Sequence, residues 1–113
     1  MQPPPVPRPT ATGKLISTAR VFVKKGKEAR MKELIVAIRR EAEASESGTL
    51  TYRATQALGT DGEFLIFEEY VDERALAHHY KGEAFTAMGE ILQNEDILDV
   101  ERGGVIIDYF EEF

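Results

Sequence analysis

Glu68 and His79 are the two residues of this sequence best suited to proton-transfer chemistry. Glu68 lies in a segment whose apolar side chains alternate as in a strand, and a carboxylate among apolar neighbours is costly unless it is paired or protonated. His79 follows Leu76 by about one helical turn, so both project from nearly one helix face. We expect Glu68 and His79 to meet between sheet and helix, where a carboxylate that orients or charges an imidazole is a common general-base arrangement.

A buried Glu68–His79 pair also has a purely structural interpretation. Such a pair can tie a helix to a sheet without doing chemistry, and perturbed pairs mark functional sites only statistically. His78 is the less suitable partner, because it is one position away and is expected to face solvent. Two adjacent histidines lack the i, i+4 spacing of a helical metal pair, so no metal site is expected.

Aromatic residues are expected to surround this pair. Such residues are most often plain core, but beside a Glu–His pair they would suit a flat aromatic ligand. The residues that could line an aromatic cleft are Tyr52, Tyr70, Phe85 and Tyr109.

The elements that must position these residues follow from hydrophobic periodicity. Alternating, β-branched segments predict strands over residues 14–24, 49–58, 63–71 and 98–110. Apolar residues at helical spacing predict a helix over residues 28–45. A second helix is predicted to begin after the N-cap Asp72, to be interrupted at Gly82 and to continue through Leu92.

Glycines mark the predicted boundaries. Gly48 is suited to a left-handed cap at the end of the first helix. Residues 59–62 predict a turn, so the second and third strands form a hairpin. The pair Gly103-Gly104 lies inside the predicted last strand and suggests a bulge or a bend.

The order βαββαβ predicts an α+β, ferredoxin-like protomer with its helices on one face of the sheet. The third strand is apolar on both sides. Its two sets of apolar side chains are Phe64, Ile66 and Tyr70 on one face, and Leu65, Phe67 and Val71 on the other. A sheet that is apolar on both faces needs two covers. We expect the helices to supply one cover and the sheet of a second copy to supply the other, in a homodimer.

Composition narrows the possible partners and places. The chain of 113 residues fits one domain, which we assign to residues 14–113. Its net charge of −6 disfavours binding to nucleic acids and to anionic membranes.

Cysteine is absent, which excludes disulfides and thiolate chemistry, and no apolar run reaches membrane-spanning length. A cytoplasmic location is expected. Dinucleotide, Walker A and GxSxG motifs are also absent.

Residues 1–13 contain all five prolines and are expected to form a disordered or polyproline-like tail. Pro4 and Pro7, followed by Arg8, also resemble an SH3-type ligand. A solvated tail is the favoured interpretation, because short proline-rich matches are compositional.

Three motifs resemble those of one family. The sequence VKKGK at 23–27 opens into the first helix, and SGTLTY at 47–52 resembles a glycine-to-tyrosine run. The most specific motif is FEEYVD at 67–72, followed by Ala75-Leu76, His79 and Phe85, which fits E-x-[WY]-x-[DS]…A-L-x-x-H…F. Over residues 14 to 110, the chain resembles the antibiotic biosynthesis monooxygenase (ABM) domains of the dimeric α/β-barrel superfamily.

This resemblance implies a dimer of ferredoxin-like protomers, each with a ligand cavity between sheet and helices. It implies oxidation of a polycyclic phenol, anthrone or quinol by molecular oxygen without a cofactor, as a tailoring step in polyketide secondary metabolism. Haem oxygenation is not expected, because the haem-degrading relatives use an asparagine on the first strand and the only asparagine here is Asn94. The implied catalytic residues are His79, Glu68 and Tyr70, and the implied substrate-binding residues are Tyr52, Phe64, Ile66, Phe85 and Tyr109.

Two other functions remain open. The same cavity could support a non-oxidative tailoring reaction such as decarboxylation, cyclisation or isomerisation. The protein could also be a non-catalytic dimer that binds a small molecule, since fold does not fix reaction.

Overall fold

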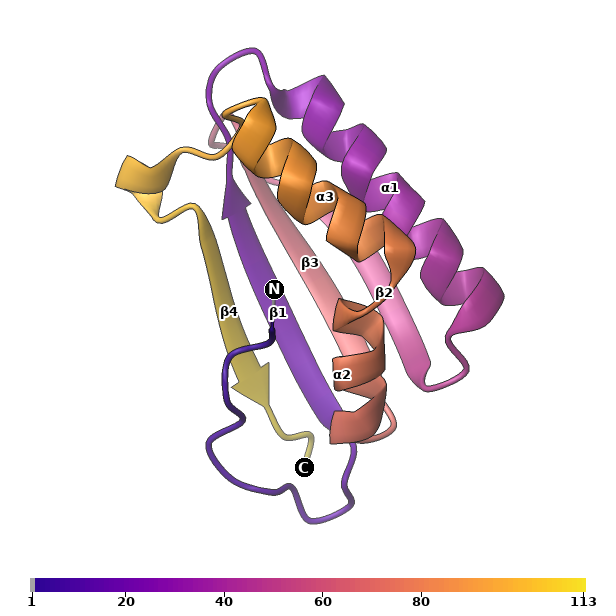
Figure 1. Cartoon of the computed structure of the whole chain (residues 1–113). Coiled ribbons are helices and arrows are strands. Elements are labelled where there is room, and N and C mark those ends of the chain that lie inside the picture. Colours follow the sequence, from indigo (N-terminus) through magenta and orange to yellow (C-terminus); the bar gives the residue numbers. More distant parts are fainter. Residues whose placement is uncertain (1) are drawn as a thin grey trace.

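The strands β1 (Leu15–Phe22) and β3 (Glu63–Tyr70) form the centre of an antiparallel sheet in the computed structural model, which describes residues 2–113 (Figure 1). The strand β2 (Thr49–Gln56) pairs with β3, and β4 (Val105–Phe110) pairs with β1, which gives the order β2-β3-β1-β4. Because β1 and β2 run in the same direction on either side of β3, the chain must cross over between them. The predicted ferredoxin-like topology is confirmed.

The helices α1 (Glu28–Ser45), α2 (Glu73–Tyr80) and α3 (Glu83–Asn94) all lie on one face of this sheet (Figure 1). The element order is therefore βαββααβ, with the second helical segment divided in two. The helix α1 supplies the crossover between β1 and β2. Its inward stripe recurs at helical spacing and consists of Met31, Leu34, Ile35, Ile38 and Ala42.

The predicted start and interruption of the second helical segment are confirmed. The Asp72 side chain accepts a hydrogen bond from the backbone N–H of Ala75 at 2.9 Å and so caps α2. Gly82 separates α2 from α3 and has no side chain with which to cap α3. The carboxylate of Glu41 on α1 takes that role, accepting from the backbone N–H groups of Glu83 and Ala84 at 3.1 and 2.9 Å. This contact fixes the α2–α3 corner against α1.

The prediction for the last strand is wrong over residues 99–104, and Leu98 forms only an isolated β-bridge with Val23. Residues Val100–Arg102 form a short 3₁₀ helix, capped by the Asp99 side chain, which accepts from the backbone N–H of Arg102 at 3.3 Å. Gly103 and Gly104 have φ values of 117° and 61°, conformations that favour glycine. The two glycines therefore end a helical turn before β4 begins, and do not form a bulge inside the strand.

Gly48 does not adopt the predicted left-handed cap. The helix α1 ends at the cap residue Glu46, and Gly48 is not among the glycines of positive φ. A Cβ atom at Gly48 would lie 2.6 Å from the Cβ of Ala75. Glycine is needed here because it lets the start of β2 approach α2 closely.

The face of the sheet opposite the helices is partly apolar and open. Leu65 on β3 is 42% exposed and Phe110 on β4 is 52% exposed. Both alternate away from the buried face that contains Ile66. The described helices offer no cover for these side chains.

The N-terminal segment, residues 2–14, forms neither helix nor strand and lies on the helix-bearing face between β4 and α2 (Figure 1). Val6 packs against a small cluster of buried residues that includes Leu15 and Tyr80. The hydroxyl of Tyr109 donates to the carbonyl oxygen of Pro4 at 2.7 Å. No helix within residues 2–113 is both long enough and apolar enough to cross a membrane.

Candidate active site

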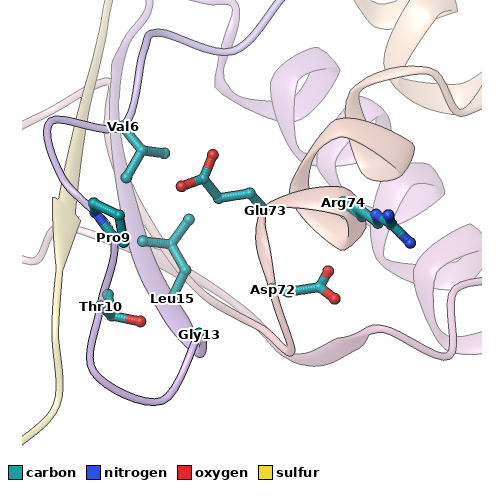
Figure 2. Close-up of a pocket in the computed structure, with 8 residues that line it drawn as sticks. All are labelled: Val6, Pro9, Thr10, Gly13, Leu15, Asp72, Glu73 and Arg74. Atoms are coloured by element: carbon teal, nitrogen blue, oxygen red, sulfur yellow. The ribbon is translucent and has the colours of Figure 1, made fainter.

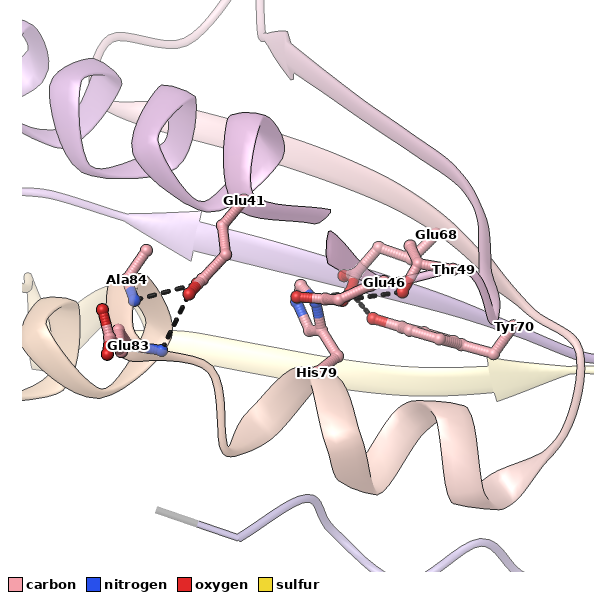
Figure 3. A network of polar contacts seen from close by, with 8 residues as sticks. All are labelled: Glu41, Glu46, Thr49, Glu68, Tyr70, His79, Glu83 and Ala84. Carbon is pink, nitrogen blue, oxygen red and sulfur yellow. Dashed lines mark hydrogen bonds and ion pairs between the residues drawn. The ribbon is translucent and has the colours of Figure 1, made fainter. Parts of the chain in front are cut away.

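The imidazole of His79 lies between two buried carboxylates (Figure 3). Its Nδ1 lies 2.7 Å from Oε1 of Glu46, and its Nε2 lies 3.7 Å from Oε1 of Glu68. The His79 side chain is only 1% exposed. The predicted meeting of Glu68 and His79 is confirmed, although the closer carboxylate is Glu46.

Three different elements bring these groups together. Glu46 follows the last turn of α1, Glu68 lies near the end of β3, and His79 lies in the last turn of α2. Thr49, at the start of β2, donates its hydroxyl to the same Oε1 of Glu46 at 2.8 Å. The backbone N–H of Thr49 also donates to the carbonyl oxygen of Glu46 at 3.1 Å. The turn between α1 and β2 therefore holds the Glu46 carboxylate in place.

Tyr70 completes the polar group from the side of the sheet. Its hydroxyl donates to Oε1 of Glu68, two residues earlier on the same face of β3. Burial raises the pKa of the Glu68 carboxyl, whereas the Tyr70 hydrogen bond and the nearby His79 lower it and Glu46 raises it further. Burial also raises the pKa of the Tyr70 hydroxyl, which stays protonated and acts as a donor. The net pKa of the Glu68 carboxyl is therefore raised, with burial as the largest cause.

A cavity of about 80 Å³ lies beside this polar group, between the sheet and the helices. Most of its wall is apolar, and the carboxyl of Glu68 and the imidazole of His79 stand among the few polar groups. The ring centroids of Tyr52 and Phe85 lie 5.5 and 5.6 Å from that of His79. Tyr80 packs on Phe85 with ring centroids 4.4 Å apart. The cavity wall is therefore mostly aliphatic, with three aromatic rings and the titratable side chains of Glu68 and His79.

The structure gathers five of the eight predicted site residues around this cavity: Tyr52, Ile66, Glu68, His79 and Phe85. Tyr70 lies behind Glu68 and reaches the site through its hydrogen bond. Phe64 is buried in the core at the other end of β3 and faces α1 and β2. Tyr109 contacts the N-terminal segment through Pro4. Neither Phe64 nor Tyr109 lines the cavity that contains His79.

Glu46 and Tyr80 are site residues that the sequence patterns missed. Glu46 lies in an irregular turn, which has no repeating side-chain spacing from which a contact with α2 could be predicted. The one available signal was Gly48, because its close approach to Ala75 brings the end of α1 toward α2. Tyr80 is adjacent to His79 and lines the same cavity. His78 is exposed, as expected.

A second depression, of about 320 Å³, lies between the N-terminal segment and the start of α2 (Figure 2). Asp72 on its wall is already engaged in capping α2. Figure 2 shows Glu73 pointing toward Val6 and Arg74 pointing away from the N-terminal segment. This depression holds no imidazole and no paired carboxylates, so it lacks the proton-transfer chemistry of the His79 cavity.

The two carboxylates approach opposite nitrogens of one imidazole ring, so the three groups do not converge on one point. A metal site requires ligands that surround a common centre. Among residues 2–113, no cluster of histidine, aspartate and glutamate side chains is arranged to hold a metal ion.

The sequence from residue 15 to residue 90 matches the model of the family described as antibiotic biosynthesis monooxygenase. The chain belongs to this family. The matched span begins at β1 and includes Glu46, Glu68 and His79, which form the polar group. The resemblance seen in the sequence is thereby confirmed.

Solved structures share the fold of this ABM protein. A proposed antibiotic biosynthesis monooxygenase from Caulobacter crescentus CB15 superposes with a TM-score of 0.79 at 24% identity, covering 90% of this chain and 92% of that chain. PA3566 of Pseudomonas aeruginosa superposes with a TM-score of 0.77 at 23% identity, covering 89% of this chain and 95% of that chain. A proposed antibiotic biosynthesis monooxygenase from Deinococcus radiodurans has a TM-score of 0.73 at 23% identity, covering 88% of this chain and 92% of that chain. At these identities the likeness shows the fold. No curated protein sequence matches the chain.

Proposed function

We propose that this ABM protein is a cofactor-independent monooxygenase that oxidises a polycyclic phenol, anthrone or quinol during secondary-metabolite tailoring. The observation that carries the proposal is the buried His79 imidazole, which lines an apolar cavity beside Tyr52, Tyr80 and Phe85 and is flanked by Glu46 and Glu68. Such a group can accept a proton from a phenolic substrate inside a site that excludes water.

The reaction would begin with proton transfer. The substrate O–H or activated C–H bond breaks, His79 accepts the proton, and the substrate becomes an electron-rich anion. The neighbouring carboxylates compensate the charge that the imidazole acquires. Tyr52 and Phe85 provide ring faces against which a flat anion can pack.

Molecular oxygen would then act as the oxidant and the second substrate. The anion gives one electron to oxygen, and the two radicals combine to form a carbon–oxygen bond. For an anthrone CH₂ group, the peroxide anion takes the proton back from His79, and loss of water from the hydroperoxide gives the quinone carbonyl. One oxygen atom enters the product and the other leaves as water, so the reaction needs no external reductant.

The cavity volume sets a condition on this proposal. Cavities that hold drug-sized ligands usually measure about 300–1,000 Å³, which is well above the 80 Å³ found beside His79. A polycyclic substrate therefore requires side chains at the wall to move. Phe85 and Tyr80 are the residues placed to do so, because both line the cavity at the α2–α3 corner, with ring centroids 4.4 Å apart.

The proposal includes a homodimer that pairs the open faces of two sheets. The exposed side chains of Leu65 and Phe110 would be buried in that contact. Burial of apolar surface of this kind is the main driving force for association. Size-exclusion chromatography with light scattering measures the oligomeric state, and a stable monomer would remove this part of the proposal.

Oxygen uptake tests the function directly. Purified protein with no added cofactor is mixed with a panel of anthrones and quinols in an oxygen electrode. We expect uptake by the wild type and by His78→Asn, whose site is on the exposed side of α2. His79→Asn keeps a donor near Glu46 but removes Nε2, so we expect a loss of about 10²-fold to 10⁴-fold in rate. The proposal fails if no substrate of the panel consumes oxygen, or if His79→Asn is as active as wild type.

One observation favours a non-oxidative or non-catalytic alternative. The polar group is internally paired, since Thr49 and Tyr70 donate to the carboxylates that flank His79, as a purely structural tie would be. A decarboxylation, cyclisation or isomerisation at this cavity would proceed without oxygen, so turnover under strict anaerobiosis identifies it. Ligand binding without any turnover identifies a binding protein.

A further inference from the structure

The carboxylate of Glu46 has an unusually constrained position for a residue outside a helix or strand. Its side chain is 4% exposed, and one oxygen, Oε1, contacts both His79 Nδ1 at 2.7 Å and the Thr49 hydroxyl at 2.8 Å. The backbone N–H of Glu46 donates to the carbonyl oxygen of Ala42 at 3.0 Å, which continues the hydrogen-bond ladder of α1. Backbone and side chain are therefore both fixed.

This contact determines which imidazole nitrogen carries the proton. Oε1 of Glu46 already accepts a hydrogen bond from the Thr49 hydroxyl, and a neutral imidazole has one N–H donor and one acceptor nitrogen. At 2.7 Å the Nδ1 of His79 is therefore the donor to this oxygen. The lone pair is left on Nε2, the nitrogen that faces Glu68 at 3.7 Å.

The opposite arrangement is less favourable. If Nε2 carried the proton, the Nδ1 lone pair would face the Glu46 carboxylate oxygen in a dry environment. Buried polar atoms without a matching partner lose their bonds to water and gain none in return, which destabilises this arrangement. The distances also favour a proton on Nδ1. Only the contact of Nδ1 with Glu46 is short enough to be a hydrogen bond, whereas Nε2 lies too far from Glu68.

We propose that Glu46 is a positioning residue that keeps the His79 proton on Nδ1 and so makes Nε2 the atom that accepts the substrate's proton. In that step the substrate O–H or C–H bond breaks, an Nε2–H bond forms, and the imidazolium remains hydrogen-bonded to Glu46. The proton-accepting role rests on the proposed function. The tautomer itself is a property of the free protein and can be measured without any substrate.

The first measurement is the nitrogen-15 NMR spectrum of full-length, ligand-free protein containing labelled histidine. The chain has two histidines, and His78→Gln removes one set of signals and so assigns the other to His79. We expect His79 to show a protonated Nδ1 and an unprotonated Nε2. A proton on Nε2 alone in the wild type would overturn the proposal.

Two variants separate positioning from a general packing effect. Glu46→Leu removes the acceptor, so we expect the His79 proton to move to Nε2. Thr49→Val removes the neighbouring hydroxyl but keeps the Glu46–His79 contact, so we expect the wild-type tautomer. If Glu46→Leu does not fold, Glu46→Met serves instead, because it also removes the acceptor and is expected to move the proton to Nε2. A wild-type spectrum in the folded Glu46 variant, or a proton on Nε2 in Thr49→Val, contradicts the proposal.

Kinetics then connect the tautomer to catalysis. With a substrate that consumes oxygen, we expect Glu46→Leu to lower kcat by about 100-fold or more with KM nearly unchanged. An Nδ1 tautomer without turnover of any substrate would leave the positioning role intact and defeat the proposed function. Turnover by a wild type whose proton is on Nε2 would support the function and defeat the positioning role.

Discussion

Oε1 of Glu46 lies 2.7 Å from Nδ1 of His79, although the two residues are 33 positions apart in the chain. This contact joins the end of α1 to the last turn of α2 and aims the other nitrogen of the ring toward Glu68. The arrangement couples stability and chemistry, because the side chain that ties these elements together is also the proposed proton acceptor.

Replacement of His79 by alanine should be strongly destabilising. It leaves the buried side chains of Glu46 and Glu68 without the imidazole that lies between them. A buried acceptor that loses its hydrogen-bond donor costs about 1–3 kcal/mol, and more for a charged group. Urea denaturation at neutral pH measures the free energy of unfolding, and the matched variant His78→Ala, at an exposed position, should change it by less than about 0.5 kcal/mol. Equal small effects of the two substitutions would contradict the buried location of His79.

The variant Glu68→Gln should alter how stability depends on pH. Burial raises the pKa of Glu68 above its ordinary value of 4.5, so the folded protein binds this proton more tightly than the unfolded chain does. Its contribution to stability is therefore complete below about pH 4.5 and is lost as the pH rises through the folded-state pKa. Glutamine does not titrate. We expect the stability of Glu68→Gln relative to wild type to increase with pH in this window, measured by urea unfolding at a series of pH values. If the stability of Glu68→Gln relative to wild type instead decreased with pH, the pKa of Glu68 in the folded protein would be lowered, contrary to this prediction.

The variant Tyr70→Phe should show how much the hydroxyl that donates to Glu68 contributes to the free energy of unfolding. The Glu68 carboxylate loses its hydrogen-bond donor in a buried place, which costs about 1–3 kcal/mol. The loss should increase with pH, because the ionised carboxylate needs the donor most. Tyr109→Phe is the control: its hydroxyl donates to the Pro4 carbonyl near the surface, so a cost below about 1 kcal/mol is expected. Thermal unfolding of both variants at two pH values tests this, and the reverse ranking would refute it.

Two glycine-to-alanine substitutions should change the stability of the fold in opposite directions. Gly48→Ala places a Cβ atom 2.6 Å from that of Ala75, and overpacking of this kind costs about 1–3 kcal/mol. Gly89 lies inside α3, and a Cβ atom there would meet nothing within 4 Å. Gly89→Ala should therefore stabilise the protein by about 0.5–1 kcal/mol, because alanine is the better helix former. Melting temperatures of the two variants provide the comparison, and a tolerated Gly48→Ala would show that β2 and α2 can separate.

The sequence was most informative where regular elements place the residues. Glu68 and Tyr70 lie on one strand face, and His79 lies one helical turn from Leu76. The alternation of the strand and the spacing of the helix were therefore enough to predict that Glu68 and His79 meet. Glu46 lies in the turn after α1, where no period applies, and its contact depends on how closely Gly48 lets two elements approach.

The errors arose where local signals have more than one structural solution. The segment from Leu98 onward is apolar like a strand, but the side chain of Asp99 caps a helical turn there. Gly103 and Gly104 have the flexibility of a bulge, yet their positive φ values end that turn. A glycine in a sequence shows that an unusual backbone or a close approach is needed, without showing which.

The central claim is that His79 is the base that removes a proton from a phenolic or anthrone substrate. Rapid mixing of protein with an anthrone under strict anaerobiosis isolates this step, because the anthrone anion absorbs at longer wavelength than the neutral molecule and cannot react further without oxygen. We expect anion formation in the wild type, none in His79→Asn, and conversion to quinone when oxygen is admitted. Equal anion formation by wild type and His79→Asn would contradict it.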